Sequence, residues 1–112
     1  MNVNTLEKLD DGGFVGNIAS FDYDFDFTLS EVKEKRTDKS PDFDVLVKSP
    51  RGRWVSIGAA WRKTANGSGN EYISITVDLR NVGRVNVNAV QGETEGDAMK
   101  IIPFATTGAD LT

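Results

Sequence analysis

Aromatic and basic side chains alternate with small polar ones in three segments near the middle of the chain. The alternation places Trp54, Tyr72 and Arg84 on one face of these segments. Nucleic-acid bases stack on aromatic rings and basic side chains follow a phosphate backbone, so such a face is typical of sheets that hold single-stranded nucleic acid. We expect the aromatics to stack bases and the cations to pair with phosphates. The expected interface comprises Trp54, Arg62, Lys63, Tyr72, Arg84 and Asn86.

Each of these residue types also has a purely structural interpretation. Trp54 can cover an edge of the core, and Tyr72 can pack its ring while its hydroxyl stays in water. The basic side chains are of the kind that is most often only solvated. The two interpretations stay open at the level of the sequence.

Trp61 occupies the opposite set of alternate positions. It shares its parity with Val55, Ile57 and Ala59, so we expect it in the hydrophobic core rather than at the interface. A β-bulge in this segment would reverse the assignment of every residue beyond it.

A second candidate surface is an acidic ladder. Asp22, Asp24 and Asp26 lie at alternate positions of one predicted strand, so neighbouring carboxylates are about 7 Å apart. That spacing is too wide for three carboxylates to share one metal ion. It resembles the spacing of phosphates, which makes an acidic DNA mimic one alternative. The structural alternative is a solvated face that opposes edge-to-edge aggregation.

The composition removes most kinds of catalytic site. The 112 residues include no His and no Cys, which excludes His-based catalytic triads, thiolate chemistry and Cys or His metal sites. No pair of carboxylates is singled out by its spacing as a hydrolytic acid and base. We therefore expect a protein that is not an enzyme and that has no cofactor and no metal.

Charge is unevenly distributed along a chain whose net charge is −4. Residues 1–46 contain 11 acidic and 5 basic residues, whereas residues 47–90 contain 2 acidic and 7 basic residues. An acidic chain of this kind is no bulk coat for nucleic acid, but its basic middle fits a local anion-binding face. Solvated hairpin tips would give the same pattern.

Short segments of alternating hydrophobicity, separated by turn signals, predict an all-β fold. We expect six or seven antiparallel strands in a small barrel or sandwich, with an OB-like arrangement as one form, and at most one short helix within residues 29–39. The expected strands are residues 14–18, 21–29, 43–48, 54–63, 71–79, 84–90 and 98–104. The expected organisation is an N-terminal arm at residues 1–11, a single β domain at 12–104 and a flexible tail at 105–112.

No apolar run is long enough to span a bilayer, and residues 1–11 lack the basic and apolar regions of a signal peptide. We therefore expect a cytoplasmic protein that does not contact the membrane.

Four segments resemble a family of small bacterial proteins catalogued as domain of unknown function 736. They are DGGFVGNI at residues 11–18, PDFDV at 41–45, IGAAWRKT at 57–64 and GNEYISI at 69–75. The resemblance covers residues 12–90 and implies a source on plasmids or integrative elements, beside conjugation genes. It implies no established activity. The acidic ladder departs from the family pattern, and so does the sequence DLRNV at residues 78–82, where relatives often have a Pro-rich turn.

The main functional hypothesis is a non-enzymatic binding module for single-stranded nucleic acid that serves plasmid transfer or maintenance. One alternative is an interaction or assembly domain that uses an exposed sheet edge or the same face to form a homodimer or to bind a protein encoded on the same element. The other alternative is the acidic DNA mimic.

Overall fold

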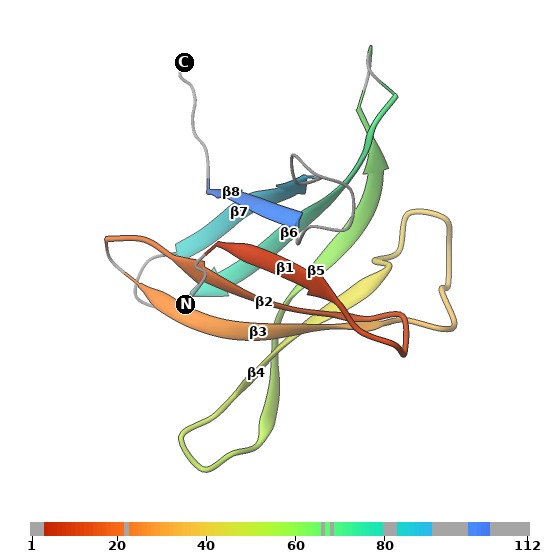
Figure 1. Cartoon of the computed structure of the whole chain (residues 1–112). Helices are drawn as coiled ribbons and strands as arrows, with labels where there is room; N and C mark the ends of the chain where they lie inside the picture. The colour runs from red at the N-terminus through yellow and green to blue at the C-terminus, as the bar shows by residue number, and fades with distance from the viewer. Residues whose placement is uncertain are drawn as a thin grey trace.

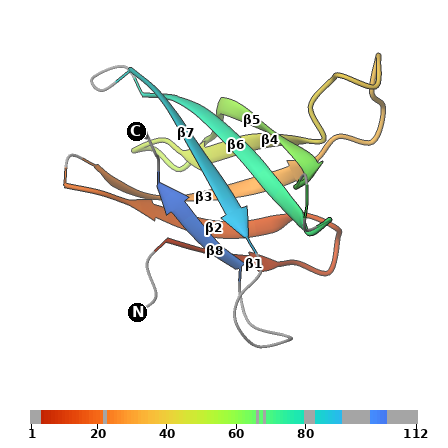
Figure 2. The ribbon, with the colours of Figure 1, turned by 90° about the horizontal axis from the view of Figure 1, so that it is seen from above.

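Eight antiparallel strands form a closed barrel in the computed structural model (Figure 1), which describes residues 4–21, 23–65, 67, 69–79, 83–90 and 99–103. Each strand pairs with its neighbours in sequence, and β1 closes the barrel against β8 (Figure 2). The strands are β1 Thr5–Lys8, β2 Phe14–Ala19, β3 Asp24–Glu31, β4 Phe43–Lys48, β5 Trp54–Thr64, β6 Glu71–Leu79, β7 Gly83–Val90 and β8 Met99–Pro103.

Alternating side chains fill the interior of the barrel. In β6, Ile73, Ile75 and Val77 are buried, while the polar residues between them are partly exposed. β-Branched side chains suit this pleated, half-buried position, which explains why the segment forms a strand. The buried core consists of Leu6, Ile18, Phe27, Leu29, Phe43, Val45, Ala60, Ile73, Ile75, Val77, Val87, Ala89 and Ile101.

The all-β class and the small antiparallel barrel are confirmed, but the number of strands is eight instead of six or seven. The additional strand is β1, which lies within the expected N-terminal arm at residues 1–11. Its register places Leu6 beside Gly16 of β2 and Met99 of β8. Only Leu6 of its four residues is buried, so local alternation gives almost no signal for this strand.

Two other expectations differ from the structure. The strands follow an up-and-down order around a closed barrel, which is neither a sandwich nor the Greek-key order of an OB fold. Residues 29–39 contain no helix: β3 continues to Glu31, and turns and bends follow. The expected tail at residues 105–112 lies outside the described part of the chain. Nowhere in the described ranges is there a helix with the length and apolar character needed to cross a membrane.

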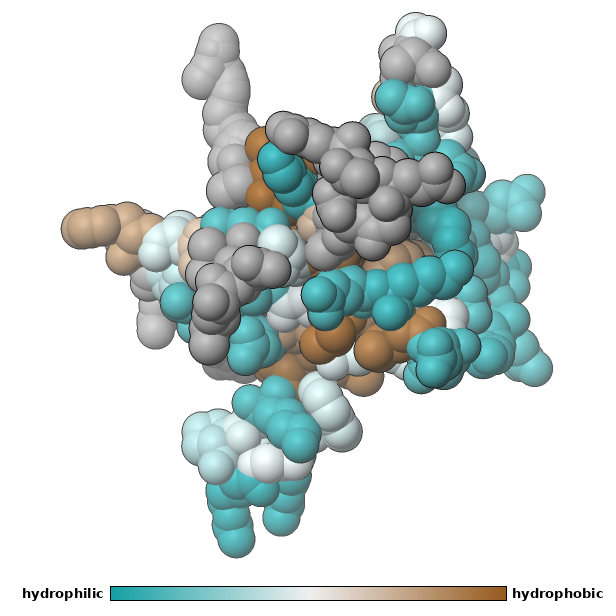
Figure 3. All heavy atoms as spheres, viewed as in Figure 1, coloured by the Kyte–Doolittle hydropathy of each residue, from teal (hydrophilic) through white to brown (hydrophobic). Residues whose placement is uncertain are grey.

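The β4–β5 hairpin extends beyond the barrel wall. β3 pairs with β4 only up to Leu46, and β6 pairs with β5 only from Gly58 onward. Residues 47–57, which we name the β4–β5 arm, therefore form a two-stranded ribbon that projects from the barrel at the bottom of Figure 1. Hydropathy colouring shows this projection as mainly hydrophilic (Figure 3).

Candidate functional site

A β-bulge in β5 decides which side chains face outward. Val45 of β4 pairs with Gly58, but the next residue, Leu46, pairs with Ser56, so Ile57 is an extra residue in β5. The bulge reverses the alternation beyond this point. Ala60 is consequently buried in the core, beside Ile75 of β6.

Trp61 therefore lies on the outer face of the barrel, opposite Ser74 of β6, and its expected place in the core is wrong. The physical reason is the extra residue at Ile57, which the parity argument did not include. A glycine in the middle of a strand often marks a bulge or a close backbone approach, so Gly58 carried the missing signal.

Gly58 allows β5 and β6 to approach closely after the bulge. A Cβ atom on Gly58 would overlap the carbonyl oxygen of Thr76 and would lie 2.8 Å from Cα of Val77. Both neighbours are backbone atoms of a central strand, so they cannot move without loss of strand pairing. The absence of a side chain at this position is thus required for the geometry that turns Trp61 outward.

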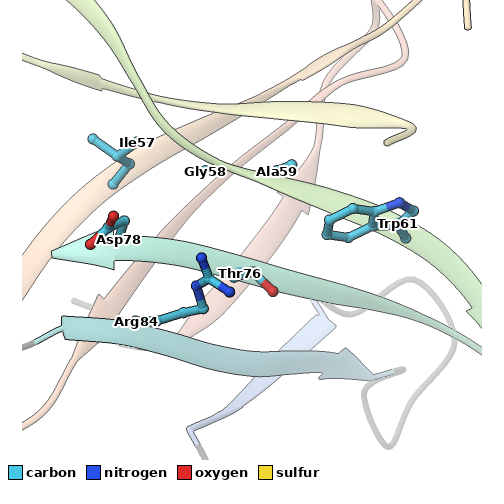
Figure 4. Close-up of a pocket in the computed structure, with 7 residues that line it drawn as sticks. All are labelled: Ile57, Gly58, Ala59, Trp61, Thr76, Asp78 and Arg84. Atoms are coloured by element: carbon cyan, nitrogen blue, oxygen red, sulfur yellow. The ribbon is translucent and has the colours of Figure 1, made fainter. Parts of the chain in front are cut away.

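Trp61 separates two shallow hollows on this outer face. One hollow, of about 290 Å³, is lined by Ile57, Gly58, Ala59, Trp61, Thr76, Asp78 and Arg84 (Figure 4). The other, of about 370 Å³, is lined by Lys39, Trp61, Lys63, Ser74 and Thr76. We name this surface of β5, β6 and β7, with both hollows, the Trp61 face.

Trp61 is held in place by its own hydrogen bond. The indole Nε1–H donates to the backbone carbonyl oxygen of Lys39 at 3.0 Å. Trp61 is partly buried, so it remains partly accessible on the outer face. A ring fixed in this way loses little conformational entropy when a planar ligand stacks on it.

Asp42 fixes the loop that carries Lys39. Its carboxylate accepts a hydrogen bond from Lys35 Nζ at 2.8 Å and another from the backbone N–H of Arg62 at 2.8 Å. The hydrogen bond from Lys35, followed by that from Arg62, holds the pKa of the Asp42 carboxyl below its ordinary value. The loop that accepts the Trp61 indole hydrogen bond is thus bound to β5 by a charged contact.

Basic side chains stand at both ends of the Trp61 face. Arg84 lies at one end, and Lys39 and Lys63 lie at the other. None of the ion pairs between described residues involves any of these three cations. Asp78 is the cross-strand neighbour of Arg84 and is the acidic residue of this surface.

The floor between the cations is small and polar. The hydroxyl of Thr76 donates to Oδ1 of Asn86 at 2.7 Å, and Asn88 lies opposite Ser74. Hydroxyl and amide groups of this kind can bind the edges of bases or the oxygens of phosphates and sugars. The arrangement therefore offers one stacking ring, three cations and a polar floor.

The structure brings only part of the expected interface together. Tyr72, Arg84 and Asn86 lie on the outer face of the barrel, as the alternation predicts. Lys63 lies there too, but only because the bulge turns its set of alternate positions outward. Tyr72 pairs with Lys63 at one end of β6, whereas Arg84 pairs with Asp78 six positions further along, which is about 20 Å. Tyr72 and Arg84 are thus at opposite ends of the face, with Trp61 between them.

Trp54 lies outside this group. It is on the β4–β5 arm, where it pairs with Lys48 of β4 and has no partner in β6. Its side chain is 55% exposed, and Lys48 Nζ lies 5.1 Å from the centroid of its ring. The expected grouping of Trp54 with Tyr72 and Arg84 at one site is wrong, because β5 extends far beyond the barrel.

Arg62 has a structural role in place of its expected position on the outer face. The reversed alternation gives it the parity of the core, opposite Ile73. Its guanidinium lies 4.5 Å from the centroid of the Phe43 ring and donates to Glu31 Oε2 at 3.0 Å. These contacts cover one end of the barrel and leave the guanidinium paired with a carboxylate.

The acidic ladder lies on the wall formed by β2 and β3. Asp24 and Asp26 are exposed on the outer face of β3, and Asp22 lies outside the described residues. The side-chain amide of Asn17 donates to Oδ1 of both Asp24 and Asp26, at 3.0 Å each. Across the described part of the chain, no group of three or more acidic residues is arranged to hold a metal ion.

Trp61 and Lys39 are the aromatic and basic side chains of the Trp61 face that were not predicted from the sequence.

A family model described as "Protein of unknown function (DUF736)" matches residues 2–102, so the chain belongs to this family. No curated protein and no solved structure shows a significant match to the chain.

Proposed function

We propose that this member of the DUF736 family is a non-enzymatic binding module that holds single-stranded nucleic acid on its Trp61 face. The supporting observation is the position of Trp61, which is fixed by its hydrogen bond to Lys39 between two hollows with cations at both ends. Stacking on a fixed indole supplies affinity without sequence preference, and the cations bind the phosphates on either side. We place this activity in the cytoplasm, in the transfer or maintenance of a plasmid.

The distribution of charge over the barrel supports this location of the ligand. The cations around Trp61 are unpaired in the described structure, whereas Asp24 and Asp26 lie on the β2–β3 wall. A polyanion is attracted to the first surface and repelled by the second, although the net charge of the chain is −4. We therefore expect binding to weaken strongly with added salt.

Binding can be measured by the fluorescence anisotropy of an end-labelled single-stranded oligonucleotide at about 50 mM and about 200 mM salt. Trp61→Ala is expected to weaken binding about 5- to 150-fold, because one stacked base contributes about 1–3 kcal/mol. Trp61→Phe keeps an aromatic ring and serves as the matched control. An unchanged affinity in Trp61→Ala, or no binding by the wild type at low salt, would reject the proposal.

Intrinsic fluorescence gives an independent readout, because the chain contains only two Trp residues. In Trp54→Phe the remaining indole is Trp61, and its emission is expected to be quenched as the oligonucleotide binds. Quenching confined to the reciprocal variant, Trp61→Phe, would instead place the ligand on the β4–β5 arm alone.

A second candidate is an assembly domain, favoured by the exposed apolar side chains. Phe21 in the β2–β3 turn is fully exposed, and Ile102 of β8, which lies opposite Asn88, is 54% exposed. Apolar side chains in such positions are typical of surfaces that a protein partner covers. Light scattering coupled to size exclusion tests this candidate: a stable dimer that Ile102→Ser dissociates supports it, and a monomer at all concentrations contradicts self-assembly.

A further inference from the structure

We propose that the β4–β5 arm binds the phosphate backbone of duplex DNA, so that the preferred ligand is a junction between duplex and single-stranded DNA. This inference rests on the proposed function, because the single strand of the junction occupies the Trp61 face.

The shape of the arm fits a groove of duplex DNA. Residues 47–57 form two antiparallel strands that have lost their other neighbours, β3 and β6. A two-stranded β-ribbon fits the major groove of B-DNA, which is about 12 Å wide. The deep and narrow major groove of A-form RNA does not admit side chains in this way, which favours DNA over RNA as the duplex.

The charge of the arm fits phosphate. Lys48, Arg51 and Arg53 are exposed, and residues 47–57 contain no Asp or Glu. The ion pairs between described residues involve none of these three cations, whereas Lys35 and Arg62 elsewhere are paired with carboxylates. Three cations on a ribbon, none of them in an ion pair between described residues, give a polyanion a concentrated positive contact.

The tip of the arm is a closed turn. The backbone N–H of Ser49 donates to the carbonyl of Arg53 at 2.7 Å, and that of Gly52 donates to the carbonyl of Ser49 at 2.8 Å. Gly52 supplies the positive φ of 79° that the turn requires. Arg51 and Arg53 are therefore presented from an ordered backbone, which lowers the entropy lost on binding.

The bulge at Ile57 connects the arm to the Trp61 face. Without the extra residue, Trp54 and Trp61 would lie on opposite faces of β5; with it, both lie on the outer face. The two rings are separated by about 20 Å of strand, which is the length of a few unstacked nucleotides. A single strand that leaves the duplex at the arm can thus reach Trp61 along the same strand face.

The test compares three fluorescent probes: a single-stranded oligonucleotide, a blunt duplex and the same duplex with a single-stranded overhang. We expect the wild type to bind the overhang probe at least about tenfold more tightly than either other probe. The variant Lys48→Gln/Arg51→Gln/Arg53→Gln should lose this advantage and keep its affinity for the single strand within about twofold. Its salt dependence on the overhang probe should fall by a slope of about 2–3, because each phosphate contact contributes about 0.9.

A matched control removes the same charge elsewhere. Lys8→Gln/Lys33→Gln/Arg36→Gln changes three exposed cations that lie outside the arm and the Trp61 face, and it should bind all three probes like the wild type. Equal affinity of the wild type for the overhang and single-stranded probes would overturn the inference, and so would an arm variant that retains the preference for the overhang. In both cases the proposed function stands if Trp61→Ala still weakens single-strand binding; failure of the wild type to bind the single strand rejects the proposed function itself.

Discussion

Two walls of the barrel carry charged side chains that differ in whether they have partners within the fold. On the β2–β3 wall, Asn17 contacts the carboxylates of both Asp24 and Asp26. On the β5–β7 wall, Lys63 and Arg84 flank Trp61 and take part in none of the ion pairs between described residues. The comparison teaches that charge alone does not identify a binding surface. Charges that already have a hydrogen-bond partner within the fold are less available to a ligand, whereas unpaired charges beside an accessible ring remain free for one.

The largest expected effect comes from removing the backbone geometry that creates the β5–β7 wall. Gly58→Val places a branched side chain against the carbonyl of Thr76, so we expect a loss of about 3–5 kcal/mol in the free energy of unfolding. Chemical denaturation measures this loss. Gly67→Ala is the control, because its Cβ meets no atom within 4 Å and only its positive φ of 90° is strained. It should cost about 1 kcal/mol. Equal losses in both variants would show that contact with β6 is unimportant.

A carboxylate introduced on the Trp61 face should make this surface repel a polyanion, as the β2–β3 wall does. Ser74→Glu adds a negative charge opposite Trp61, and we expect single-strand affinity to fall by at least about tenfold. Thr28→Glu adds the same charge on the outer face of β3, beside Asp26, and should change the affinity by less than about twofold. Anisotropy titrations of both variants measure the contrast. Similar losses in the two variants would mean that the ligand is not confined to the Trp61 face.

The variant Asp42→Asn tests whether a carboxylate that is paired within the fold stabilises it. Asp42→Asn removes the ion pair with Lys35, and we expect a loss of about 1 kcal/mol in the free energy of unfolding at neutral pH. The pKa of Asp42 is lower in the folded protein than in the unfolded chain. Its contribution to the free energy of unfolding is therefore fully present above the unfolded pKa, at about 4, and is lost as the pH falls through the folded pKa. The difference between wild type and variant should therefore narrow under acid conditions.

Denaturation curves at several pH values measure this narrowing, with Asp44→Asn as an exposed control on β4. A gap that stays constant down to strongly acid pH would show that the carboxylate charge is not what stabilises the loop.

The smallest effect is expected on the acidic wall. Asp24→Asn/Asp26→Asn should change single-strand affinity by less than about twofold and stability by less than about 0.5 kcal/mol, because both side chains are exposed and screened by salt. This variant also separates the alternative of an acidic DNA mimic. Loss of an inhibitory effect on a DNA-binding enzyme, with folding intact, would favour the mimic over the nucleic-acid binder.

The sequence predicts much of the fold because strand signals are local. β4 and β6 have the predicted bounds, and most of the other predicted strands differ by a residue or a few at their ends. β1 was not predicted, because only Leu6 of its residues is buried and its pairing with β8 joins opposite ends of the chain.

The site was predicted less well than the fold, for one physical reason. Outer positions in β6 and β7 are correct, since their alternation is uninterrupted. In β5 a single extra residue at Ile57 exchanged the roles of Arg62 and Trp61. A register shift depends on the pairing partner, so alternation within one strand cannot reveal it, and only Gly58 hinted at it.

Among the described residues, the seam that closes the barrel is the shortest strand pairing. In this part of the chain β1 and β8 are joined by the register pairs Thr5 with Lys100 and Leu6 with Met99, and by a hydrogen bond from the N–H of Ile101 to the carbonyl of Asn4. Transient opening should therefore start at this seam, and amide hydrogens there should exchange with deuterium sooner than those between β5 and β6. The barrel can thus open locally between β1 and β8, on the side away from Trp61, without disturbing the strands that support the indole.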